Sequence, residues 1–190
     1  MTVTPEPVAP LVTVASRLAD ERIRCHALRM TSNHTANDHG PGVHVPPPLF
    51  FVAGFAIGAL VHRFVAIPAP WGAIRAVTRT GTVLVMLGIA CMCTGALTFL
   101  LAKTTVMPHR PASALVTHGI YAYTRNPMYL GFTTAYVGAA LAAGLVMPLV
   151  LLPPVLFLLT VFVIRREERY LRDTFPATFD AYASRVRRWL

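Results

Sequence analysis

One uncharged apolar run, from Met128 to Ile164, constrains most strongly what this chain can fold into. As a single α-helix its 37 residues would extend for about 55 Å, at about 1.5 Å per residue. The hydrocarbon core of a bilayer is about 30 Å thick, so the run is slightly short of two full crossings. We therefore predict two membrane-spanning helices joined by a tight turn near Gly144 to Pro148. Pro153 and Pro154 are expected to bend or interrupt the second helix.

The composition also indicates a membrane protein. Hydrophobic residues make up 55% of the 190 residues and charged residues only 13%, whereas charged residues are about a quarter of a soluble domain. Two further apolar spans, Leu49 to Ile67 and Gly81 to Ala102, raise the expected number of spans to four. The second is rich in small residues, which favours close helix packing. We predict an all-α integral membrane protein of about four transmembrane helices, with a C-terminal hairpin and an interfacial amphipathic helix.

The two ends of the chain differ in character. Residues 1–47 are rich in Pro, Thr, Asn and His, so we predict a weakly ordered N-terminal arm followed by one domain over 48–190. From about Pro176 the chain is expected to form a helix along the membrane interface, because apolar side chains recur at intervals of three and four. These side chains are Phe175, Phe179, Tyr182, Val186 and Trp189.

Basic residues gather between the second and third spans and again after the fourth. They are Lys103, Arg110, Arg125, Arg165, Arg166, Arg169, Arg172, Arg185, Arg187 and Arg188. The positive-inside rule places both groups, and both termini, on the cytoplasmic side. This topology explains the formal charge of +9 without a nucleic-acid partner. The preference for Arg over Lys and the Ala-rich spans indicate a GC-rich bacterial source, and hence the bacterial plasma membrane.

The segment HGIYAYTRNPMYLG, residues 118–131, opens the long apolar run. Asn126 and Pro127 suit the N-cap and first turn of a helix, so the third span should begin there with free backbone N–H groups. Such a helix end accepts an anion, for example the carboxylate of an amino-acid-like cofactor. Three tyrosines offer ring faces to a nucleobase or an onium group. They are Tyr121, Tyr123 and Tyr129. An interfacial aromatic belt with an ordinary helix cap is the alternative interpretation.

An acidic pair, Glu167-Glu168, follows the apolar run, and the chain has no acidic residue between Asp38 and Glu167. Glu168 has Arg165 three residues before it and Arg172 four residues after it, which predicts a surface ion-pair ladder. Glu167 has no comparable helical partner. Because adjacent helical residues point about 100° apart, we expect Glu167 to face a ligand and hold ribose hydroxyls or a cofactor amine.

Three segments together resemble the isoprenylcysteine carboxyl methyltransferase and phospholipid methyltransferase superfamily. They are LVTHGIYAYTRNPMYLG, RREERYLRDTF and AYASRVRRW. The resemblance covers about residues 48–190 and is densest from residue 103 onward. It implies a membrane methyltransferase that binds S-adenosylmethionine between the C-terminal hairpin and the segment after it. The implied cofactor contacts are Ser113, Ala114, Leu115, Val116, Tyr121, Asn126, Pro127, Met128, Tyr129 and Glu167.

The chain departs from the superfamily pattern at three places. Asn126 stands where His is frequent, which keeps a hydrogen-bonding side chain, and Phe175-Pro176 replaces Phe-Gly. Val163 stands where protein-modifying members have an Arg for the substrate carboxylate, and this weakens a prenylcysteine assignment. Arg165 or Arg166 can substitute for that Arg. The candidates for orienting the acceptor are Arg125, Arg165 and Glu168.

The resemblance implies methyl transfer to a lipid-linked or amphipathic acceptor that enters from the bilayer. A sulfonium methyl group is already activated, so the enzyme mainly aligns the nucleophile, and no catalytic residue is singled out. Candidate bases are His109, His118 and the tyrosines. The acceptor, its nucleophilic atom (oxygen, nitrogen or sulfur) and the oligomeric state stay open. An NADPH-dependent sterol-reductase-like enzyme and a non-catalytic membrane protein are the alternatives. Cys91 and Cys93 have no His or Cys cluster nearby, so no metal site is predicted.

Overall fold

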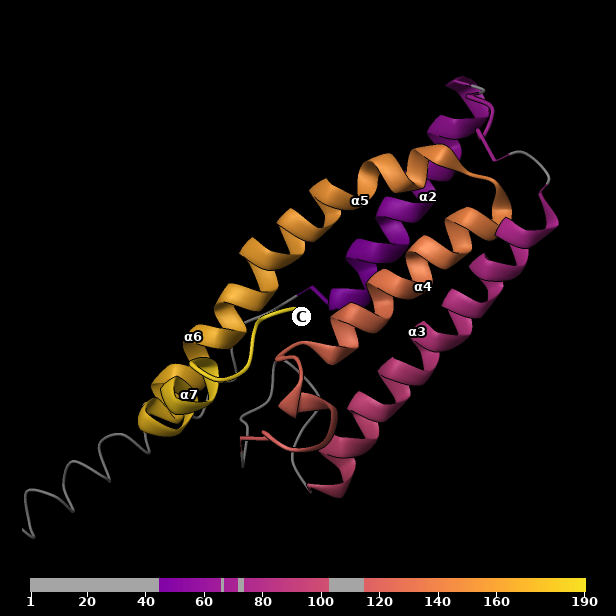
Figure 1. Cartoon of the computed structure of the whole chain (residues 1–190). Helices are drawn as coiled ribbons and strands as arrows, with labels where there is room; N and C mark the ends of the chain where they lie inside the picture. The colour runs from indigo at the N-terminus through magenta and orange to yellow at the C-terminus, as the bar shows by residue number, and fades with distance from the viewer. Residues whose placement is uncertain (1–44, 66, 72–73, 103–114) are drawn as a thin grey trace, which may run out of the picture. The chain divides into compact units, whose positions relative to one another are not determined.

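A computed structural model describes residues 45–65, 67–71, 74–102 and 115–190, which all belong to one compact unit, His39–Leu190. Residues 1–44 of the expected N-terminal arm, and the candidates Ser113, Ala114 and His109, lie outside the described residues. Every regular element in the described part is helical (Figure 1). In chain order they are α2 (Pro47–Val65), α3 (Arg75–Leu101), the 3-10 turn η1 (Gly119–Ala122), α4 (Pro127–Ala143), α5 (Val146–Leu159), the π-helical turn η2 (Thr160–Ile164), α6 (Arg165–Thr174) and α7 (Pro176–Ala183).

Three helical stretches have the length and hydropathy of membrane spans: Pro47–Val65, Arg75–Leu101 and Val146–Thr174. Their outward side chains are apolar, as Val83, Met86 and Phe157 show, each more than half exposed. Surfaces of this kind are rare on soluble monomers and suit contact with lipid. Helix α4 has 17 residues, about 25 Å of helix. It is therefore shorter than the hydrocarbon core of a bilayer, which is about 30 Å thick. The chain therefore has membrane-spanning helices, and the count of four remains a prediction.

Glycines set the contact between α3 and α4, the most extensive helix pair in the structure. Gly88 faces the backbone of Gly131, and one heptad away Gly81 faces the backbone of Gly138. Each member of a pair approaches the carbonyl oxygen of the other so closely that no Cβ would fit between them. Because the pairing runs in opposite directions along the two helices, α3 and α4 are antiparallel. This close packing fixes α4, the helix that begins at the HGIYAYTRNPMYLG segment.

Helix α5 packs mainly on α2 instead of on α4. Gly54 of α2 lies against Val155, and Gly58 lies against the backbone of Pro148. A two-residue connection separates α4 from α5, and its Gly144 adopts a φ of +67°, which glycine tolerates without strain. Since the two connected helices have different main partners, a packed hairpin in the membrane remains a prediction.

The fourth apolar stretch differs from expectation around its prolines. Helix α5 continues through Pro153 and Pro154, so these residues do not interrupt the helix, and a bend at them remains a prediction. The irregular backbone comes later, as the π-turn η2 immediately before the acidic pair. Local π adjustments and neighbouring helices re-satisfy backbone groups that prolines leave free in membrane helices. A π-turn also changes the rotation of the helix that follows, and here that helix is α6, which carries Glu167 and Glu168.

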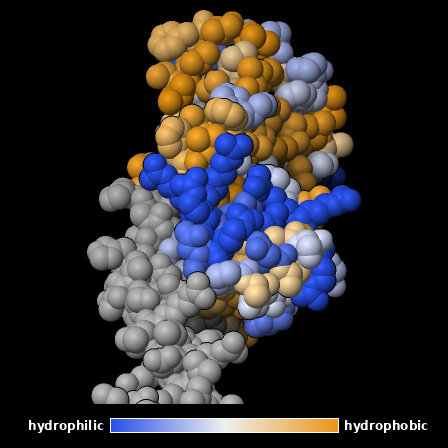
Figure 2. Space-filling model, turned by 90° about the vertical axis from the view of Figure 1, so that its left-hand side faces the viewer, coloured by the Kyte–Doolittle hydropathy of each residue, from blue (hydrophilic) through white to orange (hydrophobic). Residues whose placement is uncertain are grey.

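The C-terminal helix is shorter than predicted. Helix α7 ends at Ala183, and Val186 and Trp189 lie in a non-helical tail, 184–190. Trp189 nevertheless packs against the buried cluster that includes Tyr129 and Ile164. The surface that includes this end of the chain has hydrophilic residues gathered below a hydrophobic upper part (Figure 2). Exposed arginines of α6 contribute to the polar part: Arg165, Arg166, Arg169 and Arg172.

Candidate functional site

The site is built around the start of α4. Asn126 occupies the N-cap position and Pro127 the first turn, as the sequence predicts. The Asn126 side chain does not cap the helix; its Nδ2 donates a hydrogen bond to the Arg188 carbonyl oxygen at 2.9 Å. The Pro127 carbonyl accepts a hydrogen bond from Cys91 Sγ on α3 at 3.2 Å. The helix end is thus held from two sides, by α3 and by the C-terminal tail.

Tyr129 and Glu167, which are 38 residues apart in the chain, meet at this helix end. The Tyr129 hydroxyl donates a hydrogen bond to Glu167 Oε1 at 2.8 Å. Tyr129 is only 9% exposed, and Glu167 lies in a half-buried position on the first turn of α6. A carboxylate away from water needs a compensating partner, and the tyrosine hydroxyl supplies one. The structure therefore brings a tyrosine of the segment 118–131 into contact with an acid of the pair Glu167-Glu168.

Glu168 does not form the surface ladder expected from helical spacing. Its carboxylate accepts hydrogen bonds from Arg188 Nε at 2.9 Å and Arg188 Nη2 at 2.6 Å. Arg125 Nη1 lies 3.2 Å from the same carboxylate, and the Glu168 side chain is 13% exposed. Arg172, the predicted ladder partner, pairs with Asp180. We call Glu168, Arg125 and Arg188 the Glu168 cluster; the two-point contact from Arg188 and the single contact from Arg125 hold together three separate segments of the chain.

Backbone hydrogen bonds add to the Glu168 cluster by joining the tail to the loop before α4. Arg125 N–H donates to the Arg187 carbonyl at 3.0 Å, and Thr124 Oγ1 donates to the Arg188 carbonyl at 3.3 Å. These contacts fasten the tail to the loop and to the side chain of Asn126. Hydrogen bonds to Glu168 raise the pKa of Arg188, so this arginine stays charged.

Tyr182 links α7 to the 3-10 turn η1. Its hydroxyl donates a hydrogen bond of 2.7 Å to the Tyr121 carbonyl, and both tyrosines are buried. Tyr121 also packs edge-on against Phe99 of α3, with ring centroids 5.1 Å apart. Burial raises the pKa of Tyr182 to about 12, and the charge of Arg125 opposes the shift in part. The hydroxyl therefore remains a donor at neutral pH.

Replacing Tyr182 with phenylalanine is expected to lower the free energy of unfolding by about 1–3 kcal/mol, because the buried Tyr121 carbonyl loses its partner. Tyr123→Phe, at a 77% exposed tyrosine, should change it little. Because the folded pKa of Tyr182 lies above the ordinary value of about 10, its contribution is present below pH 10 and is lost as pH rises towards 12. Thermal unfolding in detergent at pH 8 and pH 11 measures both effects. A pH-independent difference between wild type and Tyr182→Phe would contradict the assignment.

The remaining candidates divide into buried and exposed groups. Val116 is buried and Leu115 and Met128 are half-buried, so all three are close to the packed interior. Arg165 is exposed on α6, and the described residues give it no ion pair with an acid. Tyr123 is exposed as well, so it does not join Tyr121 and Tyr129 in the interior. Arg188 and Thr124 also contact this part of the chain, although neither is among the predicted site residues. The scarcity of acids in the sequence is the feature that indicates long-range partners for Glu168.

The electrostatics of the site distinguish the two acids. Glu168 is compensated by two guanidinium groups, whereas Glu167 has a neutral tyrosine as its described hydrogen-bond partner. Arg125 Nε is buried and has no hydrogen-bond partner within the described part of the chain. Buried polar groups are normally paired, so this N–H needs an explanation such as a bound acceptor. The site thus holds a carboxylate suited to a cation or hydroxyl groups, and a donor suited to an anion.

Comparison with known proteins adds a family. The model of the phospholipid methyltransferase family matches residues 76–178, more than half of the 190-residue chain. The matched region includes Arg125, Tyr129, Glu167 and Glu168, and it ends before Arg188. A search of curated proteins finds no match. The chain belongs to the phospholipid methyltransferase family, a group within the membrane methyltransferase superfamily.

Proposed function

We propose that the protein is an integral-membrane, S-adenosylmethionine-dependent methyltransferase that methylates a lipid-linked or amphipathic acceptor. The hydrogen bond between Tyr129 and Glu167 carries this proposal, because it joins the segment 118–131 to the acidic pair Glu167-Glu168 near the start of α4. The family match supports the methyltransferase class. S-adenosylmethionine supplies an activated methyl group, so alignment of the acceptor is the main task of the chain.

The residues at the start of α4 fit a zwitterionic cofactor of this kind. Glu167 is a carboxylate without a described cationic partner, and it suits a cofactor amine or ribose hydroxyls. Arg125 Nε is a buried donor without a described acceptor, and it suits a cofactor carboxylate. The ring faces of Tyr121 and Tyr129 suit an onium group or a base. The other proposed cofactor contacts are Ser113, Ala114, Leu115, Val116, Asn126, Pro127 and Met128.

The chain's own residues would orient the acceptor and protect the reaction. Tyr129 fixes the Glu167 carboxylate, and the C-terminal tail covers the loop through the Glu168 cluster. Arg125 is held in place by Glu168, and its buried Nε–H has no described acceptor of its own. Arg165 is exposed on α6, where we propose that it meets an acceptor head group at the membrane surface. We also propose that this end of the bundle and both termini face the cytoplasm, following the positive-inside rule.

The sterol-reductase-like alternative is not favoured. It would require NADPH, whose phosphates need several cationic partners. Glu168 compensates the charges of Arg125 and Arg188, which leaves little positive charge for a set of phosphates. The single carboxylate of S-adenosylmethionine needs only one donor, such as Arg125 Nε. The family match gives the reductase no support. A non-catalytic membrane protein would not depend on Glu167 for ligand binding, so binding experiments separate it from the proposed enzyme.

Calorimetric titration of detergent-purified protein with S-adenosylmethionine, and separately with NADPH, tests the proposal. We expect binding of S-adenosylmethionine and at least about a tenfold loss of affinity, about 1.4 kcal/mol, in Glu167→Gln. Tyr129→Phe should also weaken binding, because the Glu167 carboxylate loses the hydroxyl that orients it. NADPH should give no heat of binding.

Two matched variants control for charge and for the tyrosine hydroxyl. Asp173→Asn removes an exposed carboxylate from the same helix as Glu167, and Tyr123→Phe removes an exposed hydroxyl from the same loop as Tyr121. Neither should change the affinity. Folded wild-type protein that fails to bind S-adenosylmethionine, or Glu167→Gln that binds it as well as wild type does, would overturn the proposed site. Binding of NADPH alone would favour the reductase.

A further inference from the structure

The proposed cofactor contacts at the start of α4 are enclosed by protein. Asn126 and Tyr129 are each 9% exposed, and Tyr121 is 6% exposed. Glu167, the hydrogen-bond partner of Tyr129, is half-buried. S-adenosylmethionine arrives from water, so some part of the surrounding structure must move before it reaches these side chains.

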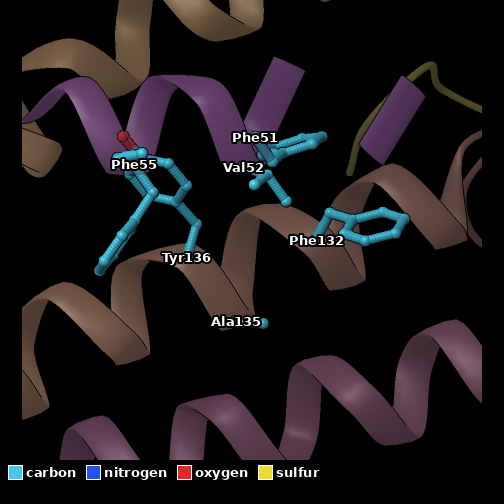
Figure 3. Close-up of a pocket in the computed structure, with 7 residues that line it drawn as sticks. Phe51, Val52, Phe55, Phe132, Ala135 and Tyr136 are labelled. Atoms are coloured by element: carbon cyan, nitrogen blue, oxygen red, sulfur yellow. The ribbon is translucent and has the colours of Figure 1, made fainter. Parts of the chain in front are cut away.

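The helices around these residues are joined by contacts that resist separation. Helices α3 and α4 meet backbone to backbone at Gly88 and Gly131. Between α2 and α4, the rings of Phe51 and Phe132 are stacked with centroids 5.3 Å apart, and both rings line an apolar groove between the two helices (Figure 3). Helix α6 continues α5 through η2 as one helical stretch, Val146–Thr174. Opening the site between these helices would pull apart close-packed surfaces.

The C-terminal tail, 184–190, is attached in a different way. It is non-helical and runs from α7 back towards the start of α4, where the Arg188 carbonyl accepts the hydrogen bond from Asn126 (Figure 1). Trp189 packs against the buried cluster that includes Tyr129, and the Arg188 side chain binds Glu168, the neighbour of Glu167. The tail thus joins the two segments that carry Tyr129 and Glu167. Its attachment is largely polar and it lies at the end of the chain, which are properties of segments that open locally.

Opening of the tail would leave the Glu168 carboxylate with a partner. Arg125 belongs to the loop before α4, and its Nη1 lies 3.2 Å from this carboxylate without help from the tail. The Arg188 side chain is already 35% exposed, so its guanidinium group regains water when it leaves. Breaking a buried ion pair is costly when one charge is left uncompensated. Here a second arginine provides the compensation, which makes the contact between Arg188 and Glu168 suitable for repeated opening.

We propose that the C-terminal tail is a gate, which moves away from the loop before α4 to admit S-adenosylmethionine and again to release the demethylated cofactor. The contact between Arg188 and Glu168 determines how readily the gate opens, so Arg188 is a positioning residue. The inference rests on the proposed function and deepens it by adding a control on cofactor exchange. The tail lies beyond residues 76–178, the region that the family model matches.

The rates of cofactor binding test the gate. Full-length protein in detergent is mixed with radiolabelled S-adenosylmethionine and filtered rapidly, and dissociation is followed after a chase with unlabelled cofactor. In Arg188→Gln we expect both the association and the dissociation rate constant to rise about tenfold, equivalent to about 1.4 kcal/mol off the opening barrier. The affinity should change much less than either rate, because a gate affects passage in both directions. Arg187→Gln is the matched control, since it removes an exposed arginine from the same tail, and it should leave both rates unchanged.

Hydrogen exchange reports on the tail without any cofactor. The Arg125 amide donates to the Arg187 carbonyl at 3.0 Å, so it can exchange with water when the tail opens. We expect this amide to exchange faster in Arg188→Gln than in wild type. The Leu130 amide donates to the Asn126 carbonyl within α4 and should exchange equally slowly in both proteins, which distinguishes local opening from global unfolding.

The outcomes separate the gate from the proposed function. Unchanged rate constants in Arg188→Gln, or faster dissociation alone with a matching loss of affinity, would overturn the gate, because Arg188 would then only support the site. Unchanged exchange of the Arg125 amide would overturn it as well. Absence of S-adenosylmethionine binding in every variant overturns the proposed function, while the Arg125 amide still decides whether the tail opens. If Arg188→Gln does not fold, Trp189→Leu weakens the apolar attachment of the tail and should raise the same two rate constants.

Discussion

Replacing Gly88 with alanine is expected to lower the free energy of unfolding by about 1–3 kcal/mol. An alanine Cβ at this position would lie 2.6 Å from both the Ala135 amide nitrogen and the Gly131 carbonyl oxygen, whereas real Cβ atoms essentially never approach within 3.0 Å. Both atoms belong to the backbone of α4. Relief of the clash therefore requires α3 and α4 to move apart.

Two effects oppose each other in Gly88→Ala. Alanine is favoured over glycine in a helix interior by about 1 kcal/mol. Against this, helices in a membrane attract each other mainly through close backbone packing, because the hydrophobic effect does not favour their association in lipid. The contact is reciprocal, since a Cβ on Gly131 would meet the Gly88 carbonyl oxygen at 2.7 Å. Neither helix can move away without losing its contact with the other. We therefore expect the packing free energy that is lost to exceed the free energy that alanine gains as a better helix former.

Gly95→Ala is the matched control on the same face of α3. The nearest atom to its Cβ would be Met128 Cγ at 2.9 Å, which belongs to a flexible side chain and can move. We expect this variant to unfold at an unchanged or slightly higher temperature. For a chain of this size each kcal/mol corresponds to roughly 2–4 °C, which circular dichroism of detergent-purified protein resolves. Equal losses in Gly88→Ala and Gly95→Ala would show that the clash with the α4 backbone does not determine stability.

The hydropathy of the sequence predicts most helix ends to within a few residues, because prolines or charged residues flank the apolar runs. The structure begins α2 at Pro47 and α4 at Pro127, within two residues of the predicted starts. Helix α3 begins at Arg75, six residues before the predicted span. Its first turns, RAVTRT, carry two arginines and two threonines, and an apolar-run criterion excludes them although they are helical. The glycine pairing of α3 with α4 needed knowledge of which helices are neighbours, which composition alone did not provide.

The sequence predicted one acid of the site and misjudged the other. Glu167 is predicted to face a ligand because it lacks a helical partner, and in the structure it contacts Tyr129 of the other motif. Helical spacing considers only local neighbours, so it pairs Glu168 with Arg165 and Arg172. Its actual partners are Arg125 and Arg188. They lie in a loop and a non-helical tail, so no periodicity could reveal them. The roles of all these residues in ligand binding remain predictions.

Glu168→Gln is expected to destabilise the protein by about 3 kcal/mol, the lower end of the range for breaking a buried ion pair. The Glu168 and Arg125 side chains are 13% and 15% exposed, whereas Arg188 is 35% exposed and keeps some hydration. Removing the carboxylate leaves two guanidinium groups close together without compensation. Arg188→Gln should cost less, because it preserves the pair between Arg125 and Glu168. The structural consequence is release of the tail, which trypsin should then cleave faster at Arg185 and Arg187.

The double variant and an exposed pair make this prediction specific to the Glu168 cluster. Glu168→Gln combined with Arg188→Gln should be more stable than Glu168→Gln alone, because it removes one of the two uncompensated charges. Asp180→Asn breaks an ion pair of similar length, 2.9 Å, whose partners are 51% and 60% exposed. It should cost less than about 1 kcal/mol, as surface pairs do. If Asp180→Asn is as destabilising as Glu168→Gln, or if the double variant is the least stable of the series, burial of the Glu168 carboxylate is not what anchors the tail. If the order holds, a single buried acid joins the loop before α4, α6 and the C-terminal tail, and leaves Glu167 available for a ligand.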